Sequence, residues 1–214
     1  MQIFKFGGAS VKDAEGSGVI EFDADFIGRS ELGHIVENQR VISALLIQLA
    51  EADQTEIVWN SKLNDMQAEE SGYELTLEDG RRIRCALIVG ADGGHSKLRE
   101  LANLKSVGWS YHQQAVVCNI ETQTEHGQVA RQWFTERGPL AFLPLGQTNL
   151  CSVVWSVEDP EDLMAMSVED FCRELALASE QDLGDILGVD KRFTFPLNQQ
   201  HSLRYIKEFQ QALV

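Results

Sequence analysis

Apolar and polar residues alternate along much of the second half of the chain, a pattern typical of strands with one buried face. Four such runs lie at residues 115–120, 130–135, 140–145 and 150–155, and turn sequences separate the last three. Strands joined by short turns most simply pair with their neighbours, so we expect an antiparallel meander. One more strand is expected at residues 192–197.

Helical periodicity appears in two longer segments. Between residues 38 and 49, apolar residues recur at intervals of three and four, which predicts an amphipathic helix with one buried stripe. Ser167 has the position of a helix N-cap, and the apolar residues after it predict a second helix, with a third, short one at residues 182–187. Strands with irregularly interspersed helices indicate an α+β fold with a large mixed sheet.

Shorter elements are expected in the first half of the chain. Strands are predicted at residues 19–26 and 56–59. Two alternating runs, at residues 73–77 and 82–85, flank Asp79-Gly80, a dipeptide that favours the tight turn of a β-hairpin.

A glycine-rich corner follows the next apolar run. Residues 86–89 predict a buried strand, which leads into Gly90-Ala91-Asp92-Gly93 and then into a helical pattern of leucines up to Leu104. In open α/β sheets ligands lie beyond the carboxyl ends of strands, and glycine lets the backbone approach a ligand closely. We interpret the corner as a ligand contact, with a simple turn and helix cap at Asp92 as the alternative.

This corner resembles a motif of a known enzyme family. Gly90-Ala91-Asp92-Gly93, followed by Ser96 and Arg99, is similar to the Asp-Gly motif of single-component flavin-dependent aromatic hydroxylases. Other segments narrow the resemblance to the FAD-dependent hydroxylases of ubiquinone biosynthesis, because they follow that family's order and approximate spacing. They are residues 32–38, 130–132, 138–145, 151–156 and 195–197, and the resemblance covers about residues 17–214.

The resemblance implies a division of the chain and a reaction. Residues 17–105 would be part of an FAD-binding region and residues 106–214 a substrate-binding sheet domain, after an unassigned segment at residues 1–16. Family members use NAD(P)H to reduce FAD, and then O₂ to add one oxygen atom to an electron-rich ring. The implied substrate is a small apolar aromatic molecule, a polyprenylated phenol or a related quinone precursor.

Candidate site residues also come from the resemblance. Arg40, Asp92, Gly93 and Arg99 would contact the cofactor, although a position on a solvated helix face is the alternative for Arg99. No residue is assigned a catalytic role, because the cofactor carries the difficult step.

The substrate would meet a strand of the sheet. Phe142, Leu143 and Pro144 resemble the strand that faces the flavin ring and the substrate, with ordinary sheet core as the alternative for each. Four further residues are candidates for the same pocket: Gln132, Trp133, Val153 and Trp155. Because successive side chains of a strand point to opposite faces of the sheet, only some of them can line it.

The ends of the chain depart from the family pattern. Neither Gly7-Gly8 nor Gly16-Ser17-Gly18 completes the Gly-x-Gly-x-x-Gly motif that seats the adenosine diphosphate of FAD, and the chain ends on the strand that would lead into a late Gly-Asp motif. We therefore expect a fragment, cut at both ends, that holds FAD weakly or not at all and is inactive in isolation. Residues 1–11 resemble the start of an aspartokinase. A gene fusion, a mis-joined reading frame and coincidence are the three explanations for this resemblance.

Composition excludes several other classes of protein. A net charge of −15 and a pI near 4.7 argue against binding to nucleic acid or anionic lipid. The four cysteines lack the paired spacing of a zinc site, so we expect free thiols, a reducing cytoplasm and no metal. No run approaches the ~18 apolar residues of a membrane helix, so any membrane association would be peripheral, through partners.

A non-catalytic module is the alternative to a hydroxylase. Such a module would use the sheet face to hold an apolar ligand or a partner subunit. Exposed apolar surface would also favour self-association, or contact with other subunits of a ubiquinone-biosynthesis complex.

Overall fold

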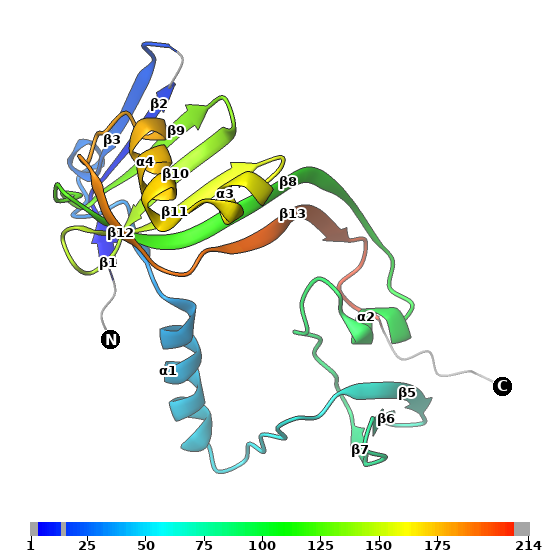
Figure 1. Ribbon diagram of the computed structural model, residues 1–214. Coiled ribbons are helices and arrows are strands. Elements are labelled where there is room, and N and C mark those ends of the chain that lie inside the picture. Colours follow the sequence, from blue (N-terminus) through cyan, green and yellow to red (C-terminus); the bar gives the residue numbers. More distant parts are fainter. Residues whose placement is uncertain (1–3, 14–15, 208–214) are drawn as a thin grey trace. The chain divides into compact units, whose positions relative to one another are not determined.

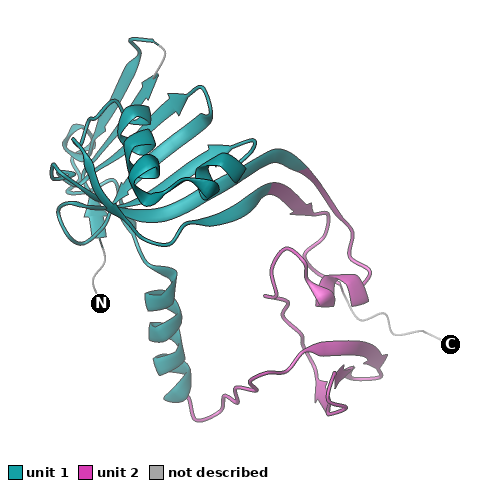
Figure 2. Cartoon of the chain, in the orientation of Figure 1, with its two compact units in different colours: residues 1–51, 110–197 teal, residues 52–109, 198–214 magenta. Residues whose placement is uncertain are grey.

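The computed structural model describes residues 4–13 and 16–207, which form two compact units (Figures 1 and 2). The first unit contains residues 1–51 and 110–197, and the second contains residues 52–109 and 198–214. Each unit is therefore assembled from segments that lie far apart in the sequence. The predicted boundary between an FAD-binding region and a substrate-binding domain, at residue 105, refers to functional domains rather than to these compact units, and it stays a prediction.

The first unit is built on an eight-stranded sheet with the order β12-β8-β11-β10-β9-β2-β3, and β13 pairs with β8. Its strands are β2 (Gly8–Asp13), β3 (Val19–Asp23), β8 (Ser106–Thr122), β9 (Val129–Thr135), β10 (Gly138–Pro144), β11 (Leu150–Val157), β12 (Ile186–Val189) and β13 (Phe193–Ser202). β9, β10 and β11 form the predicted antiparallel meander. β2 runs parallel to β9, so the sheet is mixed and the predicted α+β class is confirmed.

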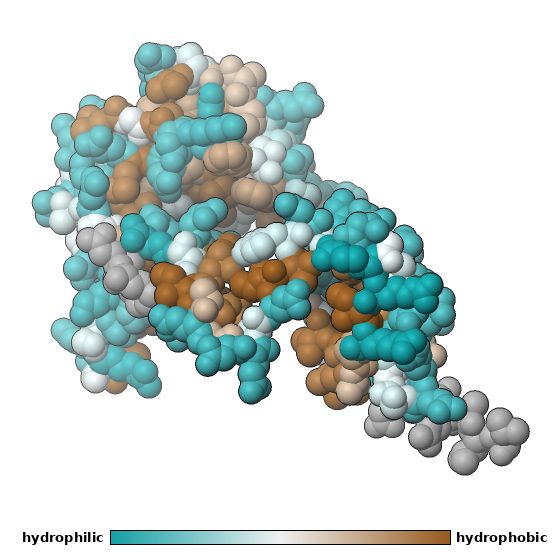
Figure 3. Space-filling view, turned by 90° about the horizontal axis from the view of Figure 1, so that it is seen from below, coloured by the Kyte–Doolittle hydropathy of each residue, from teal (hydrophilic) through white to brown (hydrophobic). Residues whose placement is uncertain are grey.

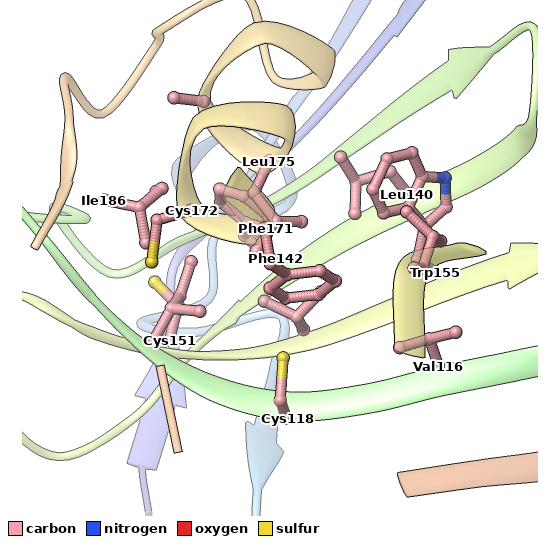
Figure 4. Packing of buried hydrophobic residues seen from close by; sticks show 14 of the residues in the cluster. Val116, Cys118, Leu140, Phe142, Cys151, Trp155, Phe171, Cys172, Leu175 and Ile186 are labelled. Atoms are coloured by element: carbon pink, nitrogen blue, oxygen red, sulfur yellow. The ribbon is translucent and has the colours of Figure 1, made fainter. Parts of the chain in front are cut away.

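The hydrophobic core lies on one face of this sheet, beneath α3 (Glu161–Ala165) and α4 (Val168–Ala178) (Figure 4). Alternate residues of β10 and β11 point into it, among them Phe142 and Trp155. Ser167 is the N-cap of α4, as predicted. Its Oγ accepts a hydrogen bond from the N–H of Asp170 at 3.1 Å. The side of β10 and β11 that faces these helices is therefore occupied by core packing.

The N-terminal residues have a place in this unit that the sequence did not predict. β1 (Phe4–Phe6) pairs with β4 (Gly33–Ile35), and β2 pairs with β9, with Ser10 opposite Arg131. Residues 1–3 and 14–15 lie outside the described residues. Pairing with a strand more than 100 positions away leaves no local pattern in the sequence.

The predicted first helix is present as α1 (Asn38–Ala50), but its expected buried stripe is not. None of its residues is buried, and Leu45 and Ile47 are 58% and 60% exposed. An apolar stripe is buried only where another element packs against it, and no described element covers this one. Apolar patches are visible on the surface shown in Figure 3.

The second unit contains the predicted hairpin. β6 (Gly72–Leu77) and β7 (Arg82–Cys85) pair around Asp79-Gly80, and β5 (Leu63–Glu69) adds a third strand. Gly80 has a φ of +85°, a conformation that favours glycine in such a turn. α2 (Lys97–Leu101) follows the glycine-rich corner.

Several expected elements differ in the structure. Residues 56–59 and 86–89 are not strands, and Leu87 and Val89 are 77% and 79% exposed. An apolar run becomes a buried strand only when a neighbouring strand pairs with it, and none of the described strands pairs with these residues.

Three other differences concern element ends. The strand expected at residues 19–26 stops at Asp23, whose side chain caps the 3₁₀ helix η1 (Ala24–Ile27). The helix expected at residues 182–187 is a turn followed by β12, which pairs with β8. α2 ends before Leu104, because Asn103 has a φ of +52° and leaves the helical conformation.

The four cysteines are free, as expected, and burial makes three of them poor nucleophiles. Burial raises the pKa of Cys118 to about 12 and that of Cys151 to about 11, and it also raises the pKa of Cys172. We predict that an alkylating reagent at pH 8 labels Cys85 first, because this thiol is half-buried while thiolate formation at the other three is suppressed. Mass spectrometry should show that Cys85→Ser abolishes rapid labelling; rapid modification of Cys118 in the native protein would contradict the core packing.

Candidate functional site

The glycine-rich corner lines an open hollow in the second unit, with a volume of about 1340 Å³. The hollow is bordered by one side of the β5–β6 pair, the corner, α2 and residues 202–207. Gly93 has a φ of +81°, and a Cβ atom on it would meet no heavy atom within 4 Å. The corner therefore presents backbone with open space beside it, in a conformation that favours glycine.

Asp92 holds the start of α2. Its Oδ2 accepts the N–H of Leu98 at 3.2 Å, and the Oγ of Ser96 accepts the N–H of Arg99 at 3.0 Å. The hydrogen bond with Ser96, helped by the Leu98 N–H, holds the pKa of the Asp92 carboxyl below its usual range. The carboxylate is charged at neutral pH and has the geometry of a turn and helix cap, while its contact with a cofactor stays a prediction.

Arg99 is tied to the same corner. Its Nη2 donates to the carbonyl oxygen of Gly94. The side-chain amide of Gln200 contacts both groups. Its nitrogen donates to the Gly94 carbonyl oxygen at 2.8 Å, and its oxygen accepts from Arg99 Nη2 at 3.2 Å. Arg99 is therefore positioned by polar atoms of the corner, and its predicted cofactor contact is not tested by this geometry.

Arg40 belongs to the first unit, on α1. Its Nε donates to Glu37 Oε2 at 2.6 Å, one turn away on an exposed surface. The positive charge already has a carboxylate partner, so its contact with a cofactor also stays a prediction.

The three predicted substrate residues do not share one face of β10. Phe142 is 1% exposed and packs edge-on against Trp133, with ring centroids 5.0 Å apart, and Pro144 is also on the core face. Leu143 is half-buried on the opposite face. Strand alternation thus separates Leu143 from its two neighbours, and their substrate contacts stay predictions.

The same alternation sorts the four further candidates. Trp133, Val153 and Trp155 lie in the core, whereas Gln132 does not. The register places Gln132 and Val154 on either side of Ala141, and Ser152 opposite Leu143. A half-buried surface of small, apolar and amide side chains therefore follows the face of the sheet opposite α4.

Sequence reasoning missed the residues that complete the hollow. Gln200 joins Arg99, and Lys105, Arg204 and Lys207 also line the hollow. Residues 105 and 204 are brought together by a backbone hydrogen bond from Leu203 N–H to the carbonyl of Lys105, at 2.9 Å. No local motif signals this pairing, because the two segments lie about a hundred positions apart.

Other kinds of site find no support in the described part of the chain. Residues 4–13 and 16–207 contain no cluster of His, Cys, Asp and Glu side chains that could hold a metal ion. No helix within those ranges has the length and apolar character required to cross a membrane.

The fold is also found in a solved structure of another protein. The chain superposes on p-nitrophenol 4-monooxygenase PnpA from Pseudomonas putida DLL-E4 with a TM-score of 0.74 and 15% sequence identity, over 96% of this chain and 54% of that chain. At this identity the likeness shows the fold alone.

Sequence relatives make the assignment closer. Residues 29–205 match the family described as FAD binding domain. The chain is 31% identical over 177 residues to ubiquinone hydroxylase UbiL of Rhodospirillum rubrum, covering 82% of this chain and 41% of that protein. It is 34% identical over 183 residues to the mitochondrial ubiquinone biosynthesis monooxygenase COQ6 of Rattus norvegicus, covering 80% of this chain and 38% of that protein.

The chain belongs to the FAD binding domain family, and the curated relatives it resembles are hydroxylases and monooxygenases of ubiquinone biosynthesis. The resemblance seen in the sequence is confirmed. The chain spans about two fifths of the length of these curated relatives. This membership does not favour the alternative of a non-catalytic module.

Proposed function

We propose that this chain is part of an FAD-dependent monooxygenase that hydroxylates the ring of a polyprenylated phenol or quinol. Family membership carries the proposal, since the relatives are named as ubiquinone hydroxylases and monooxygenases. NAD(P)H would be the reductant, and contacts with other proteins of ubiquinone biosynthesis remain part of the proposal.

The residues around the hollow fit a flavin nucleotide. Gly93 leaves open space beside its backbone, and Arg99 is held at the corner by Gly94 and Gln200. Apolar side chains, including those of Leu101 and Leu203, line the same hollow and suit an aromatic ring system. Asp92 would fix the corner by capping α2, and Gly93 and Arg99 would contact the nucleotide.

Flavin, when bound, supplies the oxygen-insertion chemistry. The protein's part is to hold the substrate ring in place and to exclude water. For that part we propose the face of β10 that carries Leu143, with Gln132 and Ser152 as polar neighbours. Phe142 and Pro144 would act indirectly, by keeping β10 fixed on its core.

A titration of this chain with FAD tests the proposal. We expect saturable but weak binding, because the sequence lacks the Gly-x-Gly-x-x-Gly motif and each 1.4 kcal/mol of lost contact weakens binding about tenfold. Gly93→Val should weaken it by a further factor of about ten, since its side chain would fill the space beside the corner. Quenching of flavin fluorescence gives the affinity.

Gly80→Val is the matched control, because Gly80 also has a positive φ and open space beside it but lies in the hairpin turn. Circular dichroism should show that both variants keep their strand content. Equal FAD affinity in the two variants, or no saturable binding to the unmodified chain, would contradict a flavin contact at the corner. Stoichiometric yellow protein would contradict the expected weakness.

A further inference from the structure

The outer side of β3 is a free edge of the eight-stranded sheet (Figure 1). β3 is the last strand in the sheet order, and within the described residues it pairs only with β2. All of its residues are exposed, and the apolar side chains of Val19, Ile20 and Phe22 are 54%, 59% and 52% exposed. An edge strand presents unpaired backbone groups, so it is a surface to which another strand can be added.

The hydrogen bonds between β3 and β2 show which backbone groups of β3 point outward. Lys12 lies opposite Val19, and in the next pair the N–H of Asp13 donates to the carbonyl of Gly18 at 3.0 Å. Hydrogen-bonded and non-hydrogen-bonded pairs alternate along an antiparallel ladder, so the even-numbered residues of β3 bond to β2. The N–H and C=O groups of Val19 and Glu21 therefore point away from the sheet.

β3 lacks the devices that block pairing at many natural sheet edges, which include lysine, proline and bulges. The strand contains neither lysine nor proline, and its register with β2 is continuous. At the other end of the sheet, the register of β12 shifts between Ile186 and Gly188. The edge at β3 is therefore the regular one of the two, and its only charged residues are Glu21 and Asp23.

These two charges select how a second copy of the same strand fits the edge. Because only odd-numbered residues have outward groups, an antiparallel pair must place odd-numbered residues opposite odd-numbered ones. Full overlap would set Glu21 opposite Glu21, and like charges that face each other destabilise a pair. Among the registers without such a clash, the one with the greatest overlap places Ile20 opposite itself and Glu21 opposite Val19.

We propose that β3 pairs antiparallel with β3 of a second copy of this chain, around a twofold axis at Ile20. Val19 and Glu21 of each strand exchange backbone hydrogen bonds with Glu21 and Val19 of the other. Ile20 packs against Ile20, and Phe22 covers Gly18 of the second copy, a pairing in which an aromatic ring stabilises an edge glycine. The contact is isologous, so it closes at two copies.

Sedimentation velocity over a range of protein concentrations tests this contact. We expect a reversible monomer–dimer equilibrium with a Kd on the order of 100 μM, because a contact of one strand is small. Ile20→Lys should raise this Kd at least about tenfold, since it places two like charges opposite each other at the axis. Added salt should strengthen the dimer, because two copies with a net charge of −15 repel each other and salt screens the repulsion.

Phe26→Lys is the matched control, because Phe26 is 86% exposed but lies in η1, beyond the strand. It makes the same change of charge and should leave the Kd unchanged. An equal loss in the two variants would mean that the copies associate through another apolar surface, and assembly beyond a dimer would contradict a closed pair. A monomer at every concentration would mean that the edge takes a different strand or none; each of these results would overturn the pairing.

Cysteine cross-linking tests the register, and it keeps the proposal falsifiable if circular dichroism shows that Ile20→Lys fails to fold. In a Cys85→Ser background, Ile20→Cys should form a disulfide-linked dimer on mild oxidation. The facing Cα atoms would lie about 4.5 Å apart, within the range that a disulfide spans. Phe22→Cys should not cross-link, because it faces Gly18 rather than itself. Equal cross-linking of the two variants, or none with Ile20→Cys, would contradict the proposed pairing.

Discussion

Phe142→Ala is expected to destabilise the first unit by about 3–5 kcal/mol, the usual cost of removing a buried phenylalanine. The ring is 1% exposed and meets Trp133 edge-on at 5.0 Å, so its loss removes apolar burial and also leaves a cavity beside an aromatic contact. The sheet and α4 pack tightly on both sides of it, and they can collapse into the space only in part (Figure 4). Equilibrium unfolding in urea, followed by circular dichroism, measures the effect.

Leu143→Ala is the matched variant one position along the same strand. Leu143 is half-buried on the opposite face, so its truncation should cost about 1 kcal/mol. Similar losses in the two variants would contradict the assignment of the two faces. If Leu143 contacts substrate in the intact enzyme, as proposed, its truncation would affect ring binding far more than it affects stability.

The pattern of β10 and its neighbours could be predicted because it is local. Alternation and short turns define the meander from β9 to β11, and the Asp-Gly turn defines the hairpin of β6 and β7. In each case the residues that pair are close in sequence. Which of Phe142 and Leu143 faces the core was not predictable, since both are apolar and the strand's orientation depends on where α4 packs.

Contacts between distant segments were not predictable. β2 lies beside β9, and residues 200–207 lie beside residues 99–105. At residues 86–89 the sequence predicted too much rather than too little. The apolar composition predicted a buried strand, but the run is exposed because no described strand pairs with it. The corner itself was found through its glycines and Asp92, but the cations that share its hollow have no motif in common.

The placement of β2 depends on a small network of charges. Asp182, in the turn after α4, accepts from Lys12 Nζ of β2 and from Arg131 Nε of β9, each at 2.7 Å. The three side chains are 22%, 17% and 26% exposed for Lys12, Arg131 and Asp182, so solvent screens the network only in part. Burial alone would raise the pKa of Asp182, but the hydrogen bonds from Lys12 and Arg131 outweigh it and lower the pKa.

Asp182→Asn is therefore expected to destabilise the first unit by about 2 kcal/mol at pH 7, because two cations lose a charged acceptor and screening reduces the full cost of a buried pair. A carboxyl whose pKa is lowered by folding stabilises the fold above its unfolded pKa, which is about 3.9 for Asp, and that contribution is lost as the pH falls through the folded value. The difference in unfolding free energy between the unmodified chain and Asp182→Asn should thus be constant from pH 7 to 5 and shrink below about pH 4.

Asp185→Asn is the control variant, because Asp185 lies in the same loop but its side-chain carboxylate forms no ion pair with any described residue. This variant should show no such difference at any pH. If Asp182→Asn behaves like Asp185→Asn, β2 is held beside β9 by backbone hydrogen bonds alone. The ion pairs of Asp182 with Lys12 and Arg131 would then contribute nothing to the register of β2.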